Sequence, residues 1–121
     1  MFKEVTIGKK RVALLANGAT PIYYHQVFKN DILQIFDQSD DPFKAVNAHA
    51  PEIAYILAKQ AEYKEEVAKL STLSYEDYIT WLSQFEALDI SGASDSIINV
   101  YLGDQETTSE AKKNEKENLK E

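Results

Sequence analysis

The side chains in this sequence that could take part in chemistry are two histidines and several groups of acidic residues. His49 and Glu52 are three residues apart, which would place two ligands on one helix face, but we expect Pro51 to break that geometry. His25 has only Lys29 as a titratable neighbour within one helical turn. We therefore interpret both histidines as surface residues without a catalytic or metal-binding role.

Asp37, Asp40 and Asp41 lie close together in a polar segment, and a divalent cation is the ligand that such a group would suggest. The segment lacks the glycine and the distal glutamate of a calcium loop, and aspartate is favoured in turns for local hydrogen bonding. The four glycines are scattered, which excludes a glycine-rich phosphate loop, and there is no cysteine. The sequence predicts no catalytic residue, no metal site and no cofactor.

Aromatic residues are the most informative feature that remains, with seven tyrosines and one tryptophan. Aromatic side chains fill the cores of small domains, and they are also enriched in protein interfaces. Tyr23 and Tyr24 are neighbours on an expected helix, so about 100° separates them and we expect at least one to be partly exposed. Tyr23, Tyr24 and Trp81 are therefore our candidate contacts with a protein partner, with core packing as the alternative.

The elements that must position these residues begin with a predicted β-hairpin. Residues 2–7 alternate in side-chain direction along a strand, a turn follows at 8–10, and residues 11–16 form a second apolar run. Thr20 and Pro21 then predict a helix start, as N-cap and first helical residue, with the helix ending near Lys29. Asn30 and Asp31 are expected to cap a short second helix.

Helical periodicity is strongest from Pro51 onward, and its apolar stripe contains one polar residue, Gln60. Ser74 and Asp77 approximate a capping box before the next helix. A last short helix is expected from about residue 95, ending at Gly103. Two of these predictions depend on apolar residues at helical spacing. They are Ile53, Ile56, Tyr63, Val67 and Leu70 for the helix from Pro51, and Tyr78, Ile79, Trp81, Leu82 and Phe85 for the helix after Ser74.

The sequence therefore predicts a mainly α fold of the α+β type, an N-terminal β-hairpin followed by a bundle of four to six helices. Residues 1–103 form one predicted globular domain. Residues 104–121 hold six acidic residues, four lysines and two apolar residues, so we expect a disordered charged tail.

The formal net charge is −7, which argues against a general nucleic-acid binder or a binder of anionic membranes, since both need a basic face. No apolar run approaches the roughly 20 residues that span a bilayer, and the N-terminus lacks the layout of a signal peptide. We expect a soluble intracellular protein.

Three segments are informative together. Residues 17–33 hold a small-residue turn, a threonine, two tyrosines and then Phe-Lys-Asn-Asp with aliphatic residues, and residues 54–61 form an aromatic-containing helix ending in AKQA. Residues 81–85 and 97–102 are followed by a polar, lysine-rich end. In this order they resemble the small tail assembly chaperones of long-tailed, siphovirus-type bacteriophages that infect Gram-positive hosts.

The resemblance implies a non-enzymatic protein that binds the tape-measure protein in the host bacterial cytoplasm and is absent from the mature virion. It also implies binding to the tail tube protein, to further copies of the chain, and to a longer form of it made by a −1 ribosomal frameshift. Ala111, Lys112 and Lys113 permit codons that contain the slippery heptamer A-AAA-AAG, and we place the candidate frameshift there. The alternatives are a generic bacterial interaction adaptor and, third, an enzyme.

Overall fold

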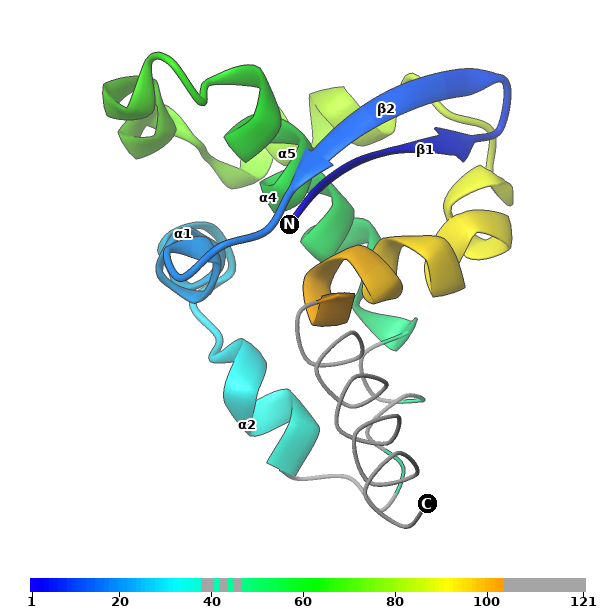
Figure 1. The fold of residues 1–121 in the computed structure, drawn as a ribbon, viewed down its shortest axis with the longest axis horizontal. Helices are drawn as coiled ribbons and strands as arrows, with labels where there is room; N and C mark the ends of the chain where they lie inside the picture. Colours follow the sequence, from blue (N-terminus) through cyan, green and yellow to red (C-terminus); the bar gives the residue numbers. More distant parts are fainter. Residues whose placement is uncertain (38–40, 42–43, 45–46, 104–121) are drawn as a thin grey trace, which may run out of the picture.

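The computed structural model describes residues 1–37, 41, 44 and 47–103 (Figure 1). The predicted tail at 104–121, including Ala111, Lys112 and Lys113, lies outside the described residues. So does Asp40, one of the three aspartates of the polar segment.

The chain begins with the predicted hairpin, in which β1 (Phe2–Ile7) pairs antiparallel with β2 (Lys10–Leu15). Gly8 occupies the tight turn with a φ of 63°, a left-handed conformation that glycine adopts without steric cost. Val5, Ile7 and Leu14 are buried, whereas Phe2, Glu4 and Thr6 are exposed. The alternation in the sequence thus separates a core face from a solvent face.

The first helix, α1, runs from Thr20–Phe28, with Ala19 at its N-cap. The prediction of Thr20 as N-cap is therefore wrong. The Thr20 hydroxyl is fully buried, where it accepts from the Asn17 N–H (3.0 Å) and donates to Gln60 Oε1 (2.7 Å). Gln60 also donates to Asn17 Oδ1 (3.0 Å), so this polar network anchors the exit of the hairpin to the core.

The short helix α2 (Ile32–Asp37) follows, and Asp31 caps it as predicted, since its Oδ1 accepts from the Leu33 N–H at 2.9 Å. Tertiary contacts of the described residues then join α1 to the next long helix, α4 (Ala50–Glu62).

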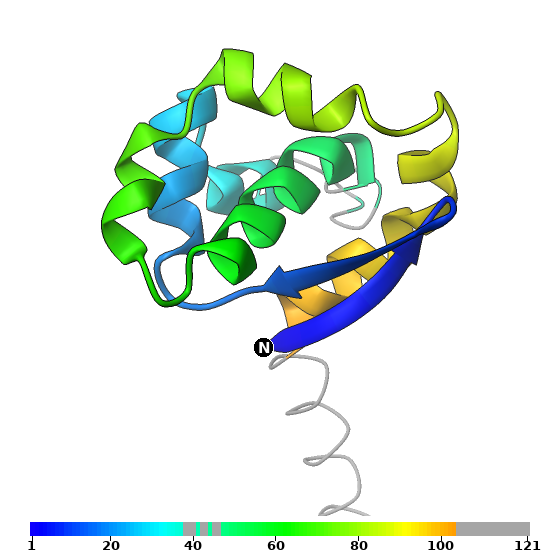
Figure 2. The ribbon, with the colours of Figure 1, turned by 90° about the horizontal axis from the view of Figure 1, so that it is seen from above.

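Helix α4 lies at the centre of the fold, and β2, α1 and α5 all pack against it (Figure 2). Its residues 53–58 are buried on every side, which is the pattern of a core helix rather than of a surface helix with one apolar stripe. Fully burying an isoleucine or leucine contributes about 1.5–3 kcal/mol to folding, so Ile53, Ile56 and Leu57 make α4 a large contributor to the hydrophobic stabilisation.

The predicted stripe from Pro51 to Leu70 is wrong in its second half. Helix α4 ends at Glu62, the chain turns at 63–65, and a 3₁₀ helix, η1 (Val67–Thr72), follows. Leu70 is buried, but Val67 is 57% exposed. A heptad stripe extends only along one unbroken helix. After the turn, other positions of the repeat face the core.

Helix α5 (Tyr75–Leu82) begins as predicted, because Ser74 Oγ accepts from the Asp77 N–H at 3.1 Å. Its core face differs from the prediction. Tyr78 is buried, whereas Ile79 is 43% exposed, since one residue further along a helix turns the side chain by about 100°. Phe85 lies beyond the end of this helix but still packs against the core.

The last helix starts at residue 89 rather than near 95. Asp89 Oδ2 accepts from the Glu86 N–H at 2.8 Å where this helix begins, and the buried residues that follow have helical spacing, Ile90, Ala93, Ile97 and Val100. Gly103 is itself helical and is the last residue that the structure describes, so the end of the helix there stays a prediction.

Residues 89–103 lie beside the hairpin in both ribbon views (Figures 1 and 2). A Cβ placed on Gly8 would overlap the Asp89 carboxyl group, and one placed on Gly103 would overlap Met1 Sδ. The two glycines therefore mark the two ends of this contact, and each allows a close approach of another side chain.

One cluster of buried residues extends from Val5 in the hairpin to Val100 in the last helix. The N-terminal hairpin and the bundle of helices that follows it thus share a core, in the mainly α arrangement that the sequence predicts. In the described part of the chain no helix has both the length and the hydropathy needed to cross a membrane.

Candidate functional site

The structure separates the two adjacent tyrosines that are candidate partner contacts. Tyr24 is fully buried, so its assignment to a partner surface is wrong. Its ring packs at 5.0 Å from that of Phe28, because it lies on the face of α1 that meets the core. Tyr23 is partly buried and packs against the core cluster from its rim.

The Tyr24 hydroxyl also lies beside Glu52 and His49, a pair whose shared geometry Pro51 was expected to break. It donates to Glu52 Oε1 at 2.8 Å, and the same oxygen lies 2.5 Å from His49 Nδ1. Pro51 does not break this geometry, because it stands in the first turn of α4, where a missing N–H costs nothing. His49 is half-buried at the N-cap, whereas His25 is exposed as predicted.

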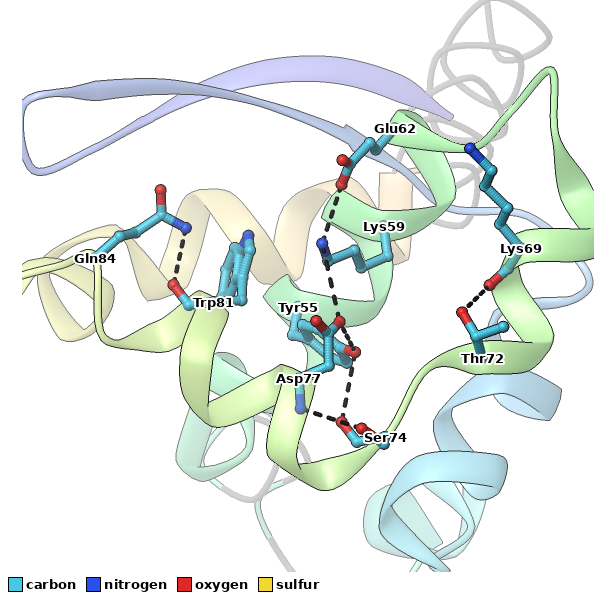
Figure 3. A network of polar contacts seen from close by, with 9 residues as sticks. All are labelled: Tyr55, Lys59, Glu62, Lys69, Thr72, Ser74, Asp77, Trp81 and Gln84. Carbon is cyan, nitrogen blue, oxygen red and sulfur yellow. Dashed lines mark hydrogen bonds and ion pairs between the residues drawn. The ribbon is translucent and has the colours of Figure 1, made fainter.

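A second tyrosine–carboxylate pair joins α4 to α5 (Figure 3). The Tyr55 hydroxyl donates to Asp77 Oδ2 at 2.6 Å, and Lys59 Nζ lies 3.9 Å from the same oxygen and 3.1 Å from Glu62 Oε2. Burial and the bond to Asp77 raise the pKa of Tyr55, as burial and the bond to Glu52 raise the pKa of Tyr24. Both phenols thus stay neutral donors, which is a structural role.

Trp81 borders a hollow that we call the Trp81 groove, with a volume of about 280 Å³. It lies between β2 and the helices α4 and α5, and it is lined by Lys10, Arg11, Val12, Ala13, Ala58, Ala61, Glu62, Trp81 and Gln84. The indole is partly buried, with ring centroids of Tyr55 and Phe85 at 5.8 and 5.0 Å. Trp81 is therefore held by the core on one side and lines the groove on the other.

A larger hollow, which we call the Phe85 cleft, includes Leu82 at the end of α5 in its lining and has a volume of about 570 Å³. Apolar residues from three parts of the chain meet there. Asn47 also lines the cleft, and its buried Oδ1 has no hydrogen-bond partner among the described residues. The cleft is lined by Lys44, Asn47, Ala48, Ala50, Pro51, Leu82, Phe85, Glu86, Ala87, Ile90, Ser91 and Ser94.

An apolar stripe along α5 is continuous with this cleft. Tyr75 is 58% exposed and Ile79, one turn later, is 43% exposed; Leu82, another turn on, lines the cleft. Residues three and four apart lie on one helix face, so these side chains form a continuous stripe. Neighbouring exposed apolar side chains mark interaction sites more often than isolated ones do.

The Phe85 cleft was not anticipated from the sequence as a site. Leu82 and Phe85 stand out by their helical spacing, but Pro51 and Ile90 come from distant segments, and no local pattern shows that they meet. The arrangement offers a protein partner an apolar surface with polar edges, the usual composition of an interface.

Among the described residues, no three histidine, aspartate or glutamate side chains are placed to hold a metal ion. A scan of protein-family models and searches of curated proteins and of solved structures found no match to this chain.

Proposed function

We propose that this protein acts by binding a segment of another protein rather than by catalysis, and that it is the short form of a phage tail assembly chaperone. The observation that carries the proposal is the Phe85 cleft together with the apolar stripe of Tyr75 and Ile79, which are exposed, and Leu82, which is partly buried. A volume of about 570 Å³ accommodates several apolar side chains of a helix that presents them at positions i, i+3 or i+4, and i+7.

A tape-measure protein is a long helical chain whose apolar stripes aggregate unless they are covered. A groove that buries such stripes reversibly keeps the partner soluble until the tail tube forms around it. In this role the chaperone works in the host cytoplasm, also contacts tail tube subunits or its own longer form, and does not remain in the virion.

The test uses the gene neighbourhood and then the protein. Under this proposal, codons 111–113 contain the slippery heptamer, the −1 frame is open, and a gene for a very long helical protein follows. A helical fragment of that protein should aggregate alone and stay soluble with this chain. Unrelated neighbouring genes and a closed −1 frame would instead favour a bacterial interaction adaptor.

A matched pair of surface variants then locates the binding face. Ile79→Glu places a charge on the stripe and should weaken binding of the fragment by about tenfold or more, because a buried unpaired charge is costly. Ile22→Glu makes the same change on α1, where the side chain is 68% exposed and far along the chain from the cleft, and should leave binding unchanged. Equal effects of the two variants would show that the cleft is not the binding site.

A further inference from the structure

The Trp81 groove differs from the Phe85 cleft in the charge of its rim. Lys10 and Arg11 stand at its β2 side, and Glu62 is the one acidic residue among its lining residues. Glu62 is already paired with Lys59 at 3.1 Å, so its charge is largely compensated. The groove is therefore lined by two basic residues and by one acid that already has a cationic partner.

The two rim cations are available to a ligand. Lys10 Nζ donates to Gln84 Oε1 at 3.0 Å, and this acceptor is a neutral amide. The Arg11 side chain is 66% exposed and lies 3.6 Å from Glu4 Oε2, in an exposed ion pair of the kind that contributes little to stability. A carboxylate of a partner can replace such a pair at small cost.

The distribution of charge along the chain makes this rim distinctive. Residues 1–11 hold four basic residues and one acid, a formal charge of +3, whereas residues 12–103 hold five lysines and 13 acids, a formal charge of −8. An acidic ligand is thus repelled by most of the domain and attracted to the hairpin. Such a pattern steers a charged partner to one place on the surface.

The inner side of the groove supplies an apolar anchor point. Ala58 and Ala61 leave room because their side chains are small, and the Trp81 indole is fixed by edge-to-face contacts with Tyr55 and Phe85. Figure 3 shows this indole between α5 and the hairpin. A rigid, partly accessible tryptophan is the residue type that most often dominates an interface.

We propose that the Trp81 groove is a second docking site, which binds an acidic segment of a protein partner. Carboxylates of the segment pair with Lys10 and Arg11, and an apolar side chain between them packs on Trp81 over Ala58 and Ala61. This site is separate from the Phe85 cleft, and the proposal does not depend on the chaperone function.

The intrinsic fluorescence of Trp81 provides the test, because it is the only tryptophan in the chain. The probe is a short acetylated and amidated peptide in which glutamate alternates with leucine, titrated into the full chain. We expect a saturable change in the emission of Trp81 that weakens as salt is raised. A peptide of the same length in which lysine alternates with leucine should give no saturable change.

Variants assign the binding to the groove. Arg11→Glu should weaken it by about tenfold or more, and Lys10→Gln, which removes a rim cation without reversing its charge, should weaken it less. Lys3→Glu is the matched control, since Lys3 is exposed on the neighbouring strand and does not line the groove. Ile79→Glu, the variant of the cleft stripe, should leave binding of the peptide unchanged, which separates this proposal from the chaperone function.

Three results would each overturn the proposal. The first is the absence of a saturable change with the acidic peptide, and the second is equally tight binding of the lysine peptide. The third is a loss in Lys3→Glu as large as that in Arg11→Glu. Circular dichroism of each variant establishes that the fold is retained, so that a loss of binding reports on the groove.

Discussion

At the scale of single residues, the core of this protein uses tyrosine as a buried hydrogen-bond donor. Tyr24 and Tyr55 are both fully buried, and each donates to a carboxylate on another helix, Tyr24 to Glu52 and Tyr55 to Asp77. A buried hydroxyl without a partner would be costly, so each bond fixes the relative position of two helices.

Replacing Tyr24 by phenylalanine removes one of these donors and leaves the ring in place. We expect Tyr24→Phe to lower the free energy of unfolding by about 1.5–3 kcal/mol, the usual range for a hydrogen bond to a charged group. Tyr75→Phe is the control, because Tyr75 is 58% exposed, and it should change stability by less than about 0.5 kcal/mol. Urea denaturation of both variants checks this, and equal effects would contradict the role of the Tyr24 bond.

The sequence could not decide between the two adjacent tyrosines. Tyr23 and Tyr24 are the same residue type at adjacent positions, so the sequence does not distinguish them. Only the way in which α1 packs on α4 turns Tyr24 toward the core. The pair of His49 and Glu52 was missed for a different reason. A proline within a helical pattern predicts an interruption, whereas Pro51 stands in the first turn of α4.

At the scale of elements, the parts with local signals were predictable. The hairpin, the Asp31 cap and the Ser74 cap each depend on residues close in sequence, and the structure confirms all three. The errors concern which face of a helix is buried and how long the helix is, and both are set by tertiary packing. Val67 and Ile79 are exposed because the surroundings of η1 and α5 decide which face is buried.

Gly8 illustrates how one residue couples two elements. Its φ of 63° suits the turn, and its missing side chain leaves room for the Asp89 carboxyl group. We expect Gly8→Ala to lower the free energy of unfolding by about 1–2 kcal/mol, from left-handed backbone strain and displacement of Asp89.

Gly92→Ala is the matched control for this glycine substitution. Gly92 lies inside the last helix, and nothing stands within 4 Å of an added Cβ. Alanine there should raise the stability by up to about 1 kcal/mol, since it has the higher helix propensity. Thermal denaturation measures both variants, and a Gly8→Ala protein as stable as the parent would show that the turn tolerates an L-residue.

At the scale of the whole molecule, the core tyrosines make stability depend on alkaline pH. Burial raises the pKa of Tyr78 to about 12, against 10.0 for a free phenol, and the pKa values of Tyr24 and Tyr55 are raised as well. In the unfolded chain these groups lose their protons near pH 10, whereas the folded protein retains them. The stabilisation is therefore complete below pH 10 and is lost as pH rises from there toward 12 and beyond.

We expect the melting temperature to decline steeply above pH 10, with phenolate absorbance of the core tyrosines appearing together with unfolding. Tyr78→Phe removes one of the ionising groups, so its melting temperature should decline less steeply over the same range. A parent protein whose core tyrosines titrate reversibly near pH 10 while folded would contradict this.

The contact between the hairpin and residues 89–103 has a consequence for how the chain acquires its structure. It joins the first and the last described elements, so nearly the whole domain must be looped out before it closes. Contacts of such long range slow folding, and we expect this one to form late. On the ribosome the hairpin emerges first and lacks this contact until residues 89–103 have left the exit tunnel, so the domain completes its fold only after its last helix has been translated.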